Sequence, residues 1–147
     1  MSEKTAQVNK TQLGFIQNVI TRVAQNSFQA KTWCITVNSA LLAICLRVNT
    51  DEIAGANNTV IGIAIVATVL FLLVANYYHY LEIQYRKLYD TVAGIDTDST
   101  IEVIDYSVSL PKELKSKVAY MKSFVSFATG GFFGIVIILL LILAKML

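Results

Sequence analysis

The side chains that most often carry chemistry are sparse in this sequence of 147 residues. Its one histidine, His79, lies among tyrosines and has no cysteine near it in the chain, so neither a metal site nor a Ser-His-Asp arrangement has enough ligands or partners. Asp96 and Asp98 resemble the start of a calcium loop, but the third oxygen position, the following glycine and the terminal glutamate are missing, which favours a turn. We therefore expect no enzyme, no catalytic residue, no metal and no cofactor.

The two cysteines, Cys34 and Cys45, fall within one apolar run. On a helix they are three turns apart, farther than the roughly 7 Å between Cα atoms that a disulfide allows. We interpret both as small buried hydrophobic residues.

Long apolar runs dominate the composition, which is 55% hydrophobic and only 15% charged. Residues 59–78 and 123–144 contain no Asp, Glu, Lys, Arg or His, and each run is long enough to cross a hydrocarbon core. A third uncharged run, 32–46, is shorter and contains Thr36, Asn38 and Ser39. Hydropathy alone leaves it ambiguous between a span and a buried helix.

The distribution of basic residues decides between these alternatives. With three spans, ten of the twelve Lys and Arg residues lie in segments 1–31 and 80–122, and only Arg47 and Lys145 lie in the other two segments. That asymmetry fits the positive-inside rule. We predict an all-α membrane protein with transmembrane helices at about 32–48, 59–79 and 123–145, its N-terminus in the cytoplasm and its C-terminus outside.

The remaining segments are predicted to form a cytosolic helical layer within one membrane domain, 1–147. Residues 11–31 show the 3.6-residue period of an amphipathic helix. It could lie on the lipid surface, but its few cations favour packing on other cytosolic helices. Segment 80–122 should begin as a continuation of the second helix, break near Gly94, and include an extended stretch at 101–110. Pro111 then fits the first turn of one long helix that reaches about Lys145.

The apolar segments contain no ionisable side chain, which argues against a proton-coupled transporter. They do contain Asn38, Thr36 and Thr68, whose side chains either hydrogen-bond a neighbouring helix or line a pore. Gly130 and Gly134 make a small-xxx-small surface that another helix can approach closely. Because three helices enclose no aqueous path, conduction would require a ring of subunits.

Basic side chains near the membrane are candidates for binding an anion. A ring of subunits would multiply them, so they could hold an oligonucleotide or anionic lipid head groups. Ordinary positive-inside topology explains the same residues. The candidates are Arg22, Arg86, Lys87, Lys112, Lys115 and Lys117.

Two stretches resemble a group of small bacterial membrane proteins. Residues 15–33 read F-I-Q-N-V-I-T-R-V-A-Q-N-S-F-Q-A-K-T-W, residues 85–90 read Y-R-K-L-Y-D, and a final apolar span follows. This overall pattern is similar to the multi-helix membrane effectors of antiphage defence operons, encoded beside nucleotidyltransferases of the CBASS and Hailong kind.

The resemblance implies a homo-oligomer in the bacterial inner membrane. Such an effector would form a channel or pore and depolarise the membrane in response to a cytosolic nucleotidyltransferase or its nucleotide or oligonucleotide product. The alternative function is a non-conducting structural or accessory subunit, which would use Gly130 and Gly134 to dock on a larger membrane complex.

Overall fold

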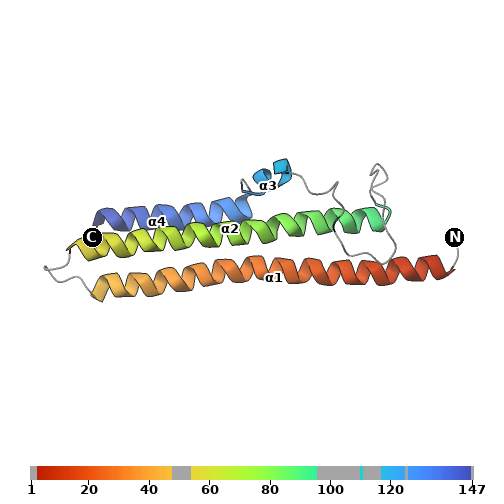
Figure 1. The fold of residues 1–147 in the computed structure, drawn as a ribbon, viewed down its shortest axis with the longest axis horizontal. Helices are drawn as coiled ribbons and strands as arrows, with labels where there is room; N and C mark the ends of the chain where they lie inside the picture. The colour runs from red at the N-terminus through yellow and green to blue at the C-terminus, as the bar shows by residue number, and fades with distance from the viewer. Residues whose placement is uncertain (1–2, 48–53, 96–109, 111–116, 125, 147) are drawn as a thin grey trace.

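The chain folds into helices that lie side by side (Figure 1). The computed structural model describes residues 3–47, 54–95, 110, 117–124 and 126–146, and all regular structure in these ranges is helical. The elements are α1 (Glu3–Arg47), α2 (Ala54–Val92), α3 (Lys117–Phe124), a π-helical turn η2 (Phe127–Gly131) and α4 (Phe132–Met146). Helices α1 and α2 run antiparallel along most of their length, and α4 lies beside the N-terminal half of α2.

Helix α1 joins the predicted amphipathic segment and the first apolar segment in one continuous helix of 45 residues. Residues at helical spacing on one face, including Ile16, Val23, Ala30 and Cys34, are buried. This face packs on α2, where Ile16 contacts Leu88. The amphipathic segment is thus packed on another helix, as its few cations predicted.

Helix α2 continues well past its apolar segment, as the sequence predicted, and ends at Val92. The backbone N–H of Gly94 donates to the Thr91 carbonyl at 3.1 Å, and the N–H of Ile95 donates to the Asp90 carbonyl at 2.9 Å. Gly94 has a φ of 70°, a conformation that a residue without a Cβ adopts readily at a helix end. The predicted break therefore begins at Gly94, while residues 96–109, including Asp96, Asp98 and most of the predicted extended stretch, lie outside the described residues.

The three apolar segments lie together at one end of the molecule (Figure 1). Ala30 and Cys34 of α1, Ala75 of α2 and Phe133 of α4 form one buried cluster. Toward the far ends of the helices, Cys45, Ile61 and Leu140 surround a second common space. The apolar parts of α1, α2 and α4 thus cover the same stretch of the long axis.

The expectation of one long helix up to Lys145 is wrong, because the backbone leaves the helix at Ser126, where ψ is 130°. The N–H groups of Thr129 and Gly130 both donate to the Ser126 carbonyl, at 3.0 and 2.8 Å, and start the π-helical turn. Two glycines, Gly130 and Gly131, follow directly, and glycine weakens an α-helix. The predicted start of this helix, 111–116, lies outside the described residues.

Only one described helix, over Asn58–Val92, is long and apolar enough by length and composition to cross a membrane. The apolar helix over Thr129–Lys145 is shorter. The structure therefore supports an all-helical chain with one such helix, and the three-span arrangement stays a proposal.

The junction of α1, α2 and α4 depends on Phe133, whose side chain is completely buried. Replacing Phe133 by Ala should lower the free energy of unfolding by about 3 kcal/mol, because the ring fills space that its neighbours cannot close. Thermal unfolding of the purified protein measures this effect. Ile135→Ala, at an exposed position of the same helix, is the matched control. Equal melting temperatures for the two variants would contradict the packing described here.

Candidate functional site

Asn38 and Thr68 form the main polar contact between the apolar parts of α1 and α2. The Asn38 Nδ2 group donates to Thr68 Oγ1 at 3.0 Å and to the Cys34 carbonyl at 2.8 Å. The Thr68 hydroxyl in turn donates to the Ala64 carbonyl at 2.8 Å. Both side chains are buried. The structure thus places these two predicted site residues in a helix–helix contact.

The space beside this contact is too small and too apolar for an aqueous path. It has a volume of about 10 Å³, close to the smallest space that holds one water molecule. Apart from Asn38 its walls are apolar: Leu41, Leu42, Cys45, Val60, Ile61, Ala64, Leu140 and Leu143. The Asn38 Oδ1 atom is buried and has no hydrogen-bond partner among the described residues.

A second group of buried polar side chains lies near the π-helical turn between α3 and α4. Ser123 Oγ donates to Asn76 Oδ1 at 2.7 Å, and Ser27 Oγ donates to the Ala75 carbonyl at 3.3 Å. Thr129, in the π-helical turn, is fully buried, and its hydroxyl has no partner among the described residues. The sequence analysis missed Ser27, Asn76 and Ser123. The amide of Asn76 at the end of an apolar run was the available signal.

The remaining residues predicted for a pore or for helix packing lie elsewhere. Thr36 is exposed, on the face of α1 turned away from α2, and its hydroxyl donates to the Thr32 carbonyl at 3.0 Å. Gly130 lies half-buried in the π-helical turn. A Cβ at Gly134 would meet nothing within 4 Å, so no close approach among the described residues requires that glycine.

Charged side chains gather at the level where the apolar segment of α1 begins and that of α2 ends. Glu82 pairs with Arg86, and the distance from Arg86 Nη2 to Glu82 Oε1 is 2.7 Å. His79 Nδ1 lies 3.8 Å from Glu82 Oε2. Partial burial lowers the pKa of Lys31, and attraction to Glu82 raises it and so offsets part of that effect. Lys31 of α1 and Glu82 of α2 thus lie near each other at this end of the apolar segments.

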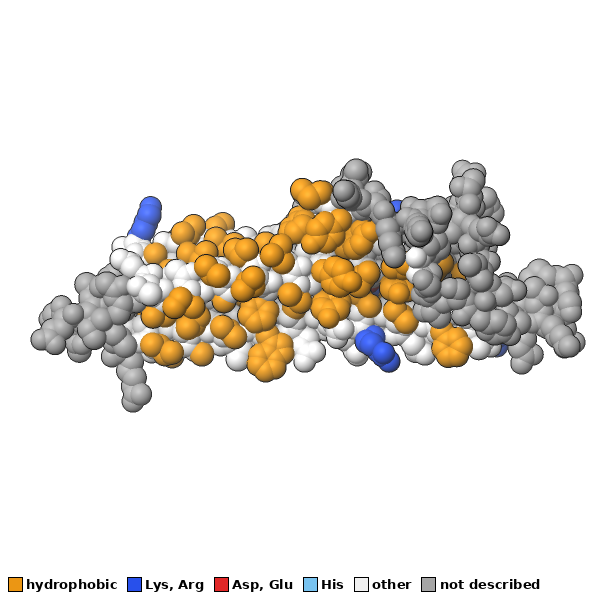
Figure 2. Space-filling view, viewed as in Figure 1, with side chains coloured by type: hydrophobic (Ala, Val, Ile, Leu, Met, Phe, Trp, Pro, Cys, Tyr) orange, Lys and Arg blue, Asp and Glu red, His pale blue; other side chains and the backbone are white. Residues whose placement is uncertain are grey.

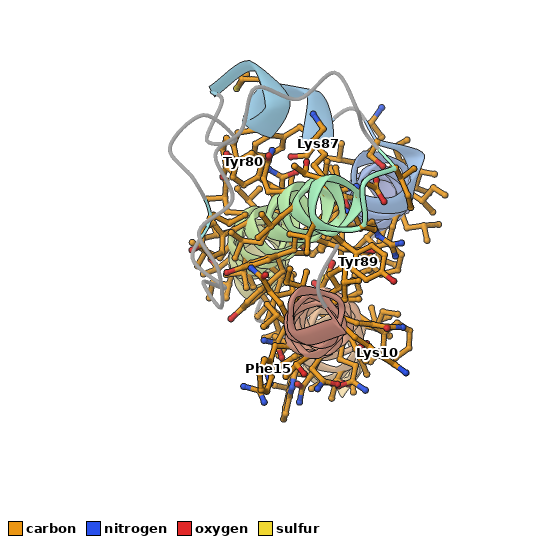
Figure 3. The ribbon with its side chains drawn as sticks, turned by 90° about the vertical axis from the view of Figure 1, so that its right-hand side faces the viewer. Lys10, Phe15, Tyr80, Lys87 and Tyr89 are labelled. Atoms are coloured by element: carbon orange, nitrogen blue, oxygen red, sulfur yellow. The ribbon has the colours of Figure 1, made fainter. Side chains whose placement is uncertain are left out.

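Farther along, α1 and α2 enclose an open cleft of about 450 Å³. Arg86, Tyr89 and Asp90 form its α2 wall, and Gln17, Ile20 and Thr21 form its α1 wall. Tyr89 lies between the two helices, whereas Lys87 points to the opposite side of α2 (Figure 3). The cleft combines a guanidinium, a phenol, an amide and a hydroxyl, which are groups that bind phosphate or a nucleobase. It also contains the Asp90 carboxylate, and its guanidinium is the one that pairs with Glu82.

The structure does not gather all six candidate anion-binding residues. Arg22 is exposed on α1, Arg86 lines the cleft, and Lys87 faces away from it. Lys117 begins α3, with no described side chain, and Lys112 and Lys115 lie outside the described residues.

No protein-family model, curated protein or solved structure matches this chain. The function is therefore inferred from the geometry of the chain itself. Within the described ranges, His, Cys, Asp and Glu side chains form no group of three or more that could hold a metal ion. The features with chemical content are the Asn38–Thr68 contact, the Glu82 group and the cleft at Arg86.

A double-mutant cycle on Asn38→Ala and Thr68→Val tests the polar contact. We expect a coupling energy of roughly 0.6 to 1 kcal/mol in the free energy of unfolding, the usual size for such hydrogen bonds between membrane helices. A parallel cycle on Asn38→Ala and Thr36→Val is the control, since Thr36 lies on the opposite face, and should be additive. Additivity in both cycles would contradict the contact.

Proposed function

We propose that this chain is a three-span inner-membrane protein that self-associates into a channel or pore and acts as an antiphage defence effector. The observation that carries the membrane part is the alignment of the three uncharged segments at one end of the molecule. Residues 32–46, 59–78 and 129–144 contain no Asp, Glu, Lys or Arg. Assembled side by side, three such segments make a body that suits a bilayer.

The exposed surface of this body supports the same proposal. Hydrophobic side chains gather over α4 and the adjoining half of α2 (Figure 2). On α4, Ile135, Ile138 and Leu139 are all more than half exposed. Water disfavours a continuous aliphatic surface of this kind, whereas lipid does not. The first span is proposed on the position of residues 32–46 beside α2 and on the basic residues that precede them.

The opposite end is proposed to lie in the cytoplasm, with the C-terminus in the periplasm. It carries Lys10, Arg22, Arg86 and Lys87, in keeping with the positive-inside rule. There α1 and α2 continue together for several turns beyond the apolar segments. This extension gives the protein a cytosolic part that can receive a signal.

The cleft at Arg86 is the proposed receptor for a nucleotide or oligonucleotide, the product of a partner nucleotidyltransferase. Arg86 supplies positive charge for a phosphate, and the Tyr89 ring can stack on a base. Gln17 and Thr21 add hydrogen-bonding groups from α1. Because the walls belong to two helices, a ligand that binds both can alter how α1 and α2 pack.

A non-conducting accessory subunit is the second candidate. It is favoured by the open space beside Gly134, which another helix can occupy. The two candidates differ in assembly, because a self-sufficient channel should migrate in detergent as a discrete homo-oligomer. An accessory subunit without its complex should be monomeric or polydisperse.

Membrane potential tests the channel proposal. A voltage-sensitive dye should report depolarisation in bacteria that express the chain, and co-expression of the nucleotidyltransferase from the same operon should trigger or suppress it. An undisturbed potential in every combination, with the chain confirmed in the membrane, would favour the accessory subunit.

Arg86→Ala tests the cleft as the receptor. It should weaken oligonucleotide binding by at least about tenfold, the usual cost of losing a charge-assisted hydrogen bond. Lys87→Ala is the matched control, because that cation points to the other side of α2, and its affinity should stay close to that of the original chain. Equal losses in both variants would indicate general attraction to positive charge and would contradict a defined cleft.

A further inference from the structure

One stripe on the outward face of α1 differs in chemistry from the outward faces of the other apolar helices, although Phe28, Trp33, Ile35 and Ile44 are exposed beside it. Along α1, exposed residues recur at alternating steps of four and three positions. Residues at this spacing lie on one face of a helix and can face a neighbouring helix. Six of them span the apolar segment and the turns before it: Gln25, Gln29, Thr32, Thr36, Ser39 and Ala43. We call these six residues the α1 seam. Each is polar or small, and none is aliphatic beyond alanine.

Helix α2 also exposes residues at alternating steps of three and four positions, but these residues are large and hydrophobic. We call them the α2 seam. Its members are Ile63, Val66, Leu70, Leu73 and Tyr77, and each is 44% exposed or more. In the proposed membrane this seam suits contact with lipid tails. The α1 seam offers lipid tails hydroxyl groups and small side chains in place of an aliphatic surface.

The α1 seam also lies opposite the internal contact of the chain. Asn38, two residues beyond Thr36, points to α2, so the seam faces away from the rest of the molecule. Figure 3 shows α1 at one edge, with α2 between it and α4. In a ring of copies, this edge position allows every α1 to face a common axis.

The charge at the cytosolic end of the seam indicates what fills the space on that axis. The same spacing continues back to Arg22, which is exposed. A dry contact between α1 helices would bring the Arg22 side chains of all copies together, since the copies run parallel in one membrane. Water separates and solvates these charges, so close packing of the α1 helices is disfavoured at this end of the seam.

From these observations we infer that the α1 seam lines a water-filled path on the axis of a ring of copies of this chain, with the α2 seam facing lipid. This inference rests on the proposed self-association in the membrane. The path would be lined by Gln25, Gln29, Thr32, Thr36, Ser39 and Ala43. Asn38 and Thr68 would not line it, because they form a packing contact inside the chain. Gln and Thr side chains supply the hydrogen-bonding surface that an ion or its hydration shell requires.

Cysteine accessibility in membranes tests the inference. The variants are Thr36→Cys, Ser39→Cys and Ala43→Cys on the α1 seam, with Val66→Cys, Leu70→Cys and Leu73→Cys on the α2 seam as matched controls. The probe is a charged, membrane-impermeant methanethiosulfonate, and mass spectrometry measures its attachment. The original chain gives the baseline, because Cys34 and Cys45 are buried.

We expect the α1 variants to react at least tenfold faster than the α2 variants, and the reaction to change any current that the channel carries. Copper-catalysed oxidation should also join α1 variants of different copies as disulfide dimers. Disulfides at the α1 positions without labelling by the charged probe would mean a dry contact and would overturn the inference. Equal labelling of the two seams would overturn it as well.

The experiment separates this inference from the proposed function. Current that flows while the α1 variants stay unlabelled would refute the α1 path and leave a channel with another lining. Rapid labelling and disulfide formation at the α1 positions, without any current from the original chain, would support the α1 path as a hydrated axis and contradict conduction.

Discussion

The packing of α1 on α2 organises the rest of this structure. Two long helices bury one face of each against the other, and where both are apolar the Asn38 amide meets the Thr68 hydroxyl. An unpaired amide in that position would carry the cost of a desolvated polar group. The bond therefore favours one register of α1 against α2, and that register brings Lys31 near Glu82 and forms the cleft at Arg86 farther along.

The same pairing separates the surfaces of the molecule by chemistry. Residues of α1 that face α2 are buried, and α2 and α4 expose mainly aliphatic side chains. Helix α1 exposes the polar and small residues of the α1 seam, with the exposed hydrophobic residues Phe28, Trp33, Ile35 and Ile44 beside them. The proposed lipid environment would account for the aliphatic surfaces, and the proposed hydrated axis between copies would account for the polar stripe. The proposed assembly follows from this difference between faces, with no need for an ionisable group within the apolar segments.

Much of the fold could be predicted from the sequence, because helical periodicity and uncharged runs are local properties. The long α2 and the end near Gly94 follow from such patterns. The break at Ser126 was missed because the run from Pro111 to Lys145 has no proline after its start, and the weaker signal of Gly130 and Gly131 was interpreted as a packing surface. Near the break, Ser123 also hydrogen-bonds Asn76 of α2, a contact that local patterns do not show.

The candidate site was less predictable for the same reason. Asn38 and Thr68 were evident as polar residues in apolar runs, but their partnership depends on how two helices align. Periodicity alone did not show that Arg86 and Lys87, adjacent in sequence, lie on different sides of α2. It also left open which face of α1 contacts α2, and thus which polar residues stay exposed.

The most direct test of the central claim concerns the first span, since residues 32–46 are the least apolar of the three segments. Reporter fusions at both ends of the chain, with green fluorescent protein active in the cytoplasm and alkaline phosphatase active in the periplasm, would locate the ends. Three spans require fluorescence only from the N-terminal fusion and phosphatase activity only from the C-terminal fusion. Both ends on the same side of the membrane would contradict the account.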